Sequence, residues 1–187
     1  MTPYYYLVAF VLGTVVGSFL NVCIYRLPRG ISIVRPGSHC PACNSPIRPY
    51  DNIPILSFLL LKGRCRQCGA KISLRYPLVE ALNGILYVMV LWRWGTGLAA
   101  LFFMALCSSA IVITFIDLDF QIIPDVITIP GTLIGLLAGS VFLPDVFSAY
   151  SPLGLKNSLI GAATGFGLFY LIAFLSRGGM GGGDIKM

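Results

Sequence analysis

The chain has 187 residues, of which 57% are hydrophobic and 11% are charged, and its mean hydropathy is +0.85. This composition excludes an ordinary water-soluble globular domain and indicates a polytopic membrane protein. The formal net charge of +6 would suit nucleic-acid binding, but the positions of the basic residues offer another explanation.

Five apolar windows are each near the ~17–25 residues that a helix needs to cross a bilayer. They cover residues 4–24, 76–92, 98–116, 126–143 and 158–175. We therefore expect an all-α polytopic membrane protein with about five transmembrane helices. The first window lacks a basic n-region, so we interpret it as a retained helix and not as a cleaved signal peptide.

The first predicted helix, in a segment of residues 1–24, carries Gly13 and Gly17. This small-residue pair favours close packing against another helix. Ser18 and Asn21 follow toward its far end, where a polar side chain needs a protein partner or water. A packing role and a functional role both stay open for them.

Residues 25–75 form the one long polar segment and hold nine of the thirteen basic residues. With Arg177 and Lys186, eleven basic residues fall on one side of a five-span protein, and only Arg93 and Lys156 fall on the other. The positive-inside rule then places this segment and the C-terminus in the cytoplasm and the N-terminus outside. The basic charge is thereby explained without nucleic acid.

Two C-x-x-C pairs lie within this segment, at Cys40, Cys43, Cys65 and Cys68. Four thiolates at this separation match a tetrahedral zinc site, and iron is an alternative occupant. Asn44 and Gly69, which follow the pairs, tolerate the positive φ of a tight metal-binding turn. Disulfides are the alternative, but a cytoplasmic loop is reducing. We expect a small cytoplasmic zinc-binding domain over residues 25–75, with His39 as a bystander.

The remaining cysteines, Cys23 and Cys107, lie in apolar windows and are interpreted as packing residues. Glu80 lies about one turn inside the second window, with Asn83 on the same helix face. An ionisable residue in a membrane span indicates a function by default. The structural alternative is snorkelling, or pairing with an arginine such as Arg75, and both readings stay open.

Three aspartates and no basic residue occupy the short segment 117–125. Asp125 follows Pro124 and precedes an apolar window, so we expect it to be a helix N-cap. Asp119 is offset from Asp117 and should lie on another helix face. We expect Asp117, at the end of its helix, to face the bundle.

A glycine run, Gly181-Gly-Gly-Asp184, follows the fifth window and leaves the backbone open to the approach of another chain. The third and fifth windows both run inward, so Asp117 and Asp184 should emerge on the same side. Two carboxylates sharing one proton hydrolyse a peptide bond, one as general base and the other as general acid. Membrane-edge aspartates serve cation or proton transport equally well, so spacing alone leaves both functions open.

Several motifs in chain order resemble those of the bacterial type IV prepilin peptidases. They are Gly17-Ser-Phe-Leu-Asn-Val22, Tyr25-Arg-Leu-Pro28, the two C-x-x-C pairs, Arg75-Tyr-Pro-Leu-Val-Glu80, Ile116-Asp-Leu-Asp with Ile123-Pro-Asp125, and Gly181-Gly-Gly-Asp184. The resemblance implies an intramembrane aspartic endopeptidase of the bacterial inner membrane that removes the basic leader of prepilins and pseudopilins at the cytoplasmic face. It also implies N-methylation of the new N-terminal residue with S-adenosylmethionine.

Within this resemblance the catalytic aspartates fall on Asp117 and Asp184, in a peptidase core over residues 76–187. We assign Gly181, Gly183, Asp119 and Glu80 to supporting the substrate or the loop. Members of the family usually continue with further apolar helices, whereas this sequence stops three residues after Asp184, so we expect a partial chain. The alternatives are a non-catalytic zinc-bearing scaffold of a secretion system and an acidic ion or proton carrier.

Overall fold

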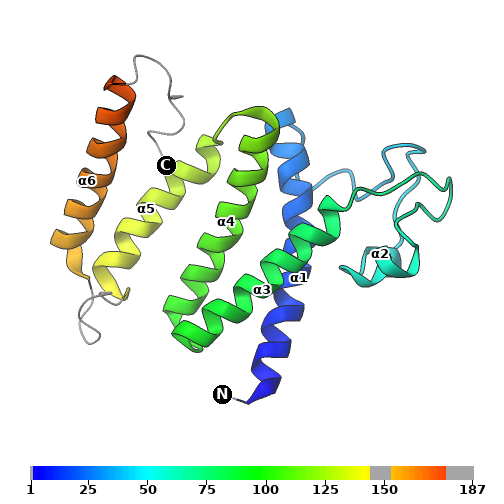
Figure 1. Ribbon diagram of the computed structural model, residues 1–187, viewed down its shortest axis with the longest axis horizontal. Coiled ribbons are helices and arrows are strands. Elements are labelled where there is room, and N and C mark those ends of the chain that lie inside the picture. Colours follow the sequence, from blue (N-terminus) through cyan, green and yellow to red (C-terminus); the bar gives the residue numbers. More distant parts are fainter. Residues whose placement is uncertain (1, 144–152, 176–187) are drawn as a thin grey trace.

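The computed structural model describes residues 2–143 and 153–175. Over these residues the chain is helical and contains isolated β-bridges but no β-strand (Figure 1). The α-helices are α1 (Pro3–Arg26), α2 (Leu56–Leu60), α3 (Arg75–Trp94), α4 (Leu98–Phe120), α5 (Asp125–Val141) and α6 (Gly154–Leu175). Two short 3₁₀ turns, Leu27–Arg29 and Pro49–Asn52, lie in the segment between α1 and α3. The predicted all-α fold is confirmed for this part of the chain.

Each predicted apolar window forms a helix, but not all of these helices are equally suited to crossing a bilayer. Within the described residues, three stretches are long and apolar enough to do so: Pro3–Arg29, Leu98–Phe120 and Gly154–Ile172. The apolar helix α5 has 17 residues, and α3 carries Arg75, Glu80 and Arg93. The count of five spans therefore stays a prediction.

α1 and α3 pack together most intimately, because glycines remove the side chains where they cross. A Cβ on Gly13 would lie 2.7 Å from the Cα of Gly84, and one on Gly17 would lie 2.7 Å from the Cα of Glu80. Both distances are far below an ordinary carbon contact of ~3.5–4.0 Å. The predicted packing role of Gly13 and Gly17 is confirmed, and Glu80 and Gly84 form the opposing surface.

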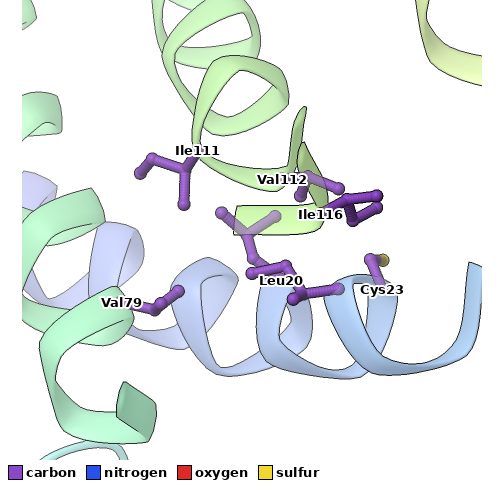
Figure 2. Packing of buried hydrophobic residues seen from close by; sticks show 7 residues of the cluster. Leu20, Cys23, Val79, Ile111, Val112 and Ile116 are labelled. Carbon is purple, nitrogen blue, oxygen red and sulfur yellow. The ribbon is translucent and has the colours of Figure 1, made fainter. Parts of the chain in front are cut away.

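An apolar core fills the space where α1, α3 and α4 meet (Figure 2). It consists of Leu20, Cys23 and Ile24 from α1, Val79 from α3, and Ile111, Val112 and Ile116 from α4. Cys23 is a packing residue as predicted, while Cys107 is half-buried beside a second cluster. Dispersion contacts of this kind hold membrane helices together, since lipid is as apolar as the side chains.

A buried polar network crosses the same three helices. The Asn83 side-chain amide donates to the Gly13 carbonyl at 2.7 Å, and its oxygen accepts from the Ser108 hydroxyl at 2.9 Å. The Tyr87 hydroxyl lies 3.1 Å from the same Ser108 oxygen. Asn21 similarly donates from α1 to the Tyr76 carbonyl at 3.1 Å. The observed contacts favour the packing role for Asn21, and they give Asn83 the same role.

α5 packs beside α4 and α6 packs against α5, so the helices form a row from α1 and α3 to α6 (Figure 1). A Cβ on Gly139 would lie 2.5 Å from the Ser158 Oγ, so this glycine allows α6 to approach. A cavity of about 340 Å³ lies between α5 and α6, lined in part by Gly139 and Ser158. Gly135, one turn earlier on α5, has open space where a Cβ would be.

Candidate functional site

The last turns of α4 carry the first acidic residues of the predicted catalytic segment. α4 continues to Phe120, so Asp117 and Asp119 lie on the helix and not in the following loop. Ile116 is fully buried in the core, whereas Asp117 is exposed. Asp117 was expected to face the bundle, but within the described residues its side chain is exposed, because the apolar face of α4 fixes the rotation of the helix.

Asp119 forms an ion pair with Arg75 that the sequence did not predict. The Arg75 Nη1 donates to the Asp119 Oδ2 at 2.5 Å, and the Arg75 Nη2 donates to the Phe115 carbonyl at 3.0 Å. The guanidinium also lies over the Phe115 ring, 4.8 Å from its centroid. Arg75 is the first residue of α3. This contact therefore ties the start of α3 to the end of α4.

Asp125 is not the N-cap that the sequence predicted. α5 begins at Asp125 itself, and Pro124, in an extended conformation, holds the N-cap position. A carboxylate in the first turn still interacts favourably with the positive end of the helix dipole. Asp184, Gly181 and Gly183 lie outside the described residues, so the distance between the two predicted catalytic aspartates stays a prediction.

Glu80 is a buried carboxylate that holds the preceding loop. Its Oε2 accepts a hydrogen bond from the Ile55 backbone N–H at 2.7 Å, and the Ser18 side chain supplies another. The alternative of pairing with Arg75 is wrong, because Arg75 engages α4. Ile55 has a φ of 60°, a strained value for a β-branched residue. The hydrogen bond to Glu80 stabilises this unusual turn immediately before α2.

The four predicted metal-ligating cysteines converge in two matching turns. In the first, the Cys40 N–H donates to the Ser45 carbonyl at 2.9 Å, and the Asn44 N–H donates to the Cys40 carbonyl at 2.8 Å. The second repeats this pattern from Cys65, with Gly69 in place of Asn44. Asn44 and Gly69 have φ values of 54° and 70°. Their predicted positive φ is confirmed.

The geometry of the four sulfurs fits a metal ion. Their Sγ atoms all lie within 4.8 Å of one another, and Cys40 and Cys68 are 3.9 Å apart. Zn–S bonds of ~2.3 Å in a tetrahedron place sulfurs ~3.8 Å apart, so a small contraction closes the site. All six cysteines are free thiols, which argues against the disulfide alternative. His39 lies outside this cluster, with its Nδ1 3.0 Å from the Gly37 carbonyl.

The electrostatics of the cluster also favour a cation. Hydrogen bonds with the side chain and backbone of Ser45 lower the pKa of Cys43 to about 6, which favours the metal-binding thiolate. At Cys68 the backbone of Ala70 lowers the pKa, but desolvation and the neighbouring sulfurs outweigh it and raise the pKa to about 11. The Cys68 thiol therefore resists ionisation when no positive charge lies beside it. A divalent cation removes this resistance.

Two contacts were not predicted from the sequence: the Arg75–Asp119 ion pair and the Glu80–Ile55 hydrogen bond. The sequence suggested Arg75 only as a partner of Glu80, which lies on the same helix. Its position at the predicted start of the span was the available signal, because an arginine there reaches either a lipid phosphate or a neighbouring helix end. The Tyr87 and Ser108 members of the buried network were also missed.

The described chain is thus a helical membrane protein that joins a four-cysteine cluster, whose geometry fits a metal ion, to an acidic helix end. Its sequence matches the Bacterial Peptidase A24 N-terminal domain over residues 11–94 and the Type IV leader peptidase family over residues 104–187. No solved structure matches it.

Curated relatives share similarity over almost the whole chain. A protein of Neisseria gonorrhoeae named prepilin leader peptidase/N-methyltransferase is 36% identical, over 100% of this chain and 73% of that protein. Proteins of the same name from Myxococcus xanthus and Bacillus subtilis are 42% and 36% identical. These alignments cover 97% and 96% of this chain, but 53% and 69% of the relatives. The chain belongs to the type IV leader peptidase family, and the resemblance drawn from its motifs is confirmed.

Proposed function

We propose that this chain is the aspartic endopeptidase that removes the leader of type IV prepilins or pseudopilins and then N-methylates the new N-terminus. Family membership supports the enzyme class, and the family match over residues 104–187 includes both Asp117 and Asp184. The observation that carries the proposal is the Arg75–Asp119 ion pair. It brings the segment that follows the four cysteines against the helix end that bears Asp117.

The chemistry follows from the two carboxylates. One ionised aspartate removes a proton from a water molecule, which attacks the carbonyl carbon of the scissile bond, and the other, protonated, donates to the carbonyl oxygen. The tetrahedral intermediate then collapses: the second aspartate takes its proton back, the C–N bond breaks, and the leaving amine receives the proton held by the first aspartate. The exposure of Asp117 suits this role, because both water and an extended peptide need access to it. Asp119 is held by Arg75 and supports the helix end. Gly181 and Gly183 would let the substrate backbone lie close to Asp184.

Methylation is the second half of the proposal. Its acceptor is the amine that cleavage exposes, so the two activities benefit from lying at one end of the helices. S-adenosylmethionine would supply the methyl group, as the methyltransferase in the relatives' names suggests, and no residue of the chain is assigned to binding it. Zinc at Cys40, Cys43, Cys65 and Cys68 would hold the loop in shape and take no part in bond breaking.

We further propose that the catalytic end faces the cytoplasm of a bacterium, in its inner membrane. The segment 25–75 holds nine basic residues, and such segments stay on the cytoplasmic side. The proposed domains are the first helix (1–24), the zinc unit (25–75) and the peptidase core (76–187). In intact cells, membrane-impermeant thiol reagents should leave single cysteines in the 25–75 segment unlabelled. Labelling from outside would invert this topology.

The decisive experiment measures leader removal and methylation of a prepilin by mass spectrometry, with the protein in proteoliposomes. Asp117→Asn and Asp184→Asn should each abolish cleavage, and the double variant should be no worse, because residues that act as one unit are strongly non-additive. Methylation of a pre-cleaved pilin should survive. Asp125→Asn is the matched control and should be mild, because asparagine keeps the size of aspartate and a side-chain oxygen that accepts hydrogen bonds at the start of a helix.

The outcome that contradicts this assignment is near-normal cleavage by Asp117→Asn together with inactivation by Asp119→Asn or Asp125→Asn. The catalytic aspartate would then lie elsewhere in the segment. If the unmodified chain neither cleaved nor methylated the prepilin, the chain would be the zinc-bearing scaffold or the ion carrier considered above.

A further inference from the structure

The short helix α2 presents a row of leucines outward. Ser57 is its buried residue, with a hydroxyl that accepts from the Ile53 N–H at 3.0 Å and donates to the Tyr50 carbonyl at 2.9 Å. Leu56, Leu59 and Leu60 lie three and four residues apart, on one helix face. They are 50%, 64% and 72% exposed. Three adjacent leucine side chains with this degree of exposure are unfavourable in water.

The position of α2 along the helices indicates what covers these leucines. The Ile55 N–H, just before α2, is bound to Glu80, and Glu80 packs against Gly17 of α1. Gly17 precedes the end of α1 at Arg26 by nine residues, which corresponds to about 14 Å along the helix. The start of α2 therefore lies well short of the end of α1. Figure 1 shows α2 beside the first turns of α3 and not beyond the end of α1.

If α1 spans the bilayer, this level falls at or inside the hydrocarbon boundary. α1 has 24 residues and is therefore about 36 Å long, only slightly longer than a hydrocarbon core of ~30 Å. A point about 14 Å from its end falls within the hydrocarbon or its boundary. The start of α3 is also apolar and exposed, with Leu74 at 74% and Leu78 exposed as well.

Two basic side chains follow α2 directly and lie near its C-terminal end. Lys62 and Arg64 follow α2 immediately and are exposed. Long basic side chains at this position reach back toward lipid phosphates while their stems stay in the apolar layer. We propose that α2 is embedded in the leaflet at the Arg26 end of α1, with acyl chains against its leucines and lipid phosphates against Lys62 and Arg64. Glu80 anchors it by binding the backbone of Ile55.

The test places a single tryptophan on α2 of the full chain, reconstituted in vesicles of phosphatidylcholine and phosphatidylglycerol. Trp92 and Trp94 are replaced by phenylalanine, and Leu59→Trp is introduced as the reporter. Gln67→Trp, an exposed polar position in the second cysteine turn, is the matched control. Lipids carrying a nitroxide near the top of the acyl chain should quench the reporter severalfold more strongly than the control, because an interfacial helix lies ~5–10 Å into this boundary.

Equal weak quenching of the two positions would overturn the proposal. Leu60→Trp is a second reporter, and far-UV circular dichroism verifies that each variant is folded. If the reporter is quenched by no lipid but becomes shielded when a prepilin peptide is added, the surface binds substrate and the proposal is wrong. If Lys62→Gln combined with Arg64→Gln leaves the quenching unchanged, the proposed phosphate contacts are wrong.

Discussion

Replacing Gly17 with alanine directly tests the α1–α3 crossing. The new Cβ would lie 2.7 Å from the Glu80 Cα and 3.2 Å from the Val79 carbonyl oxygen, and neither backbone atom can rotate away. Since carbon atoms pack at ~3.5–4.0 Å, the helices must separate by about 1 Å. Overpacking of this size destabilises a protein by ~1–3 kcal/mol. The folding constant should fall roughly five- to 150-fold.

The measurement is a denaturant titration in mixed micelles, followed by circular dichroism. Gly135→Ala is the matched control, because it is also a helical glycine but has open space where the Cβ would lie. It should be neutral or slightly stabilising. Equal stability of the two variants would refute the crossing geometry, and with it the depth assigned to Glu80 and α2.

Two further predictions concern the cysteine unit and the ion pair. Cys65→Ser should remove bound zinc, loosen the 25–75 segment to proteolysis and reduce methylation more than cleavage, because structural zinc supplies much of the folding free energy of so small a unit. Equal loss of both activities would contradict that separation. Arg75→Gln should reduce cleavage severalfold by freeing the end of α4, and Arg75→Asp combined with Asp119→Arg should restore part of it. If cleavage did not recover in the swapped variant, loss of the charge pair would not explain the reduced cleavage by Arg75→Gln.

The cysteine turns were predictable because their geometry is local. Each C-x-x-C pair is followed by a residue that tolerates positive φ, and Asn44 and Gly69 adopt it. The Gly13 and Gly17 pair was likewise readable, since close helix packing needs small residues at this spacing. The surface of α3 that packs against these glycines could not be predicted, because the spacing of small residues does not say which helix lies opposite.

The contacts that sequence reasoning missed join distant residues. Arg75 and Asp119 are 44 positions apart, and Ile55 and Glu80 are 25 apart, so only the packing of the helices brings them together. Asp117 was misplaced for a related reason, because burial of Ile116 fixes how α4 is rotated. The predicted N-cap position, Asp125, was wrong by one residue, which is the ordinary uncertainty of a helix boundary.

The buried network of Asn83, Ser108 and Tyr87 fixes how α1, α3 and α4 are rotated and aligned relative to one another. Rotating α3 by one residue turns its side chains by ~100° and carries Asn83 away from both Gly13 and Ser108. The freed amide, hydroxyl and carbonyl groups would then face hydrocarbon, where no water replaces the lost hydrogen bonds. α1, α3 and α4 therefore neither slide nor turn against one another in small steps, and the acidic end of α4 keeps a fixed position relative to α1 and α3.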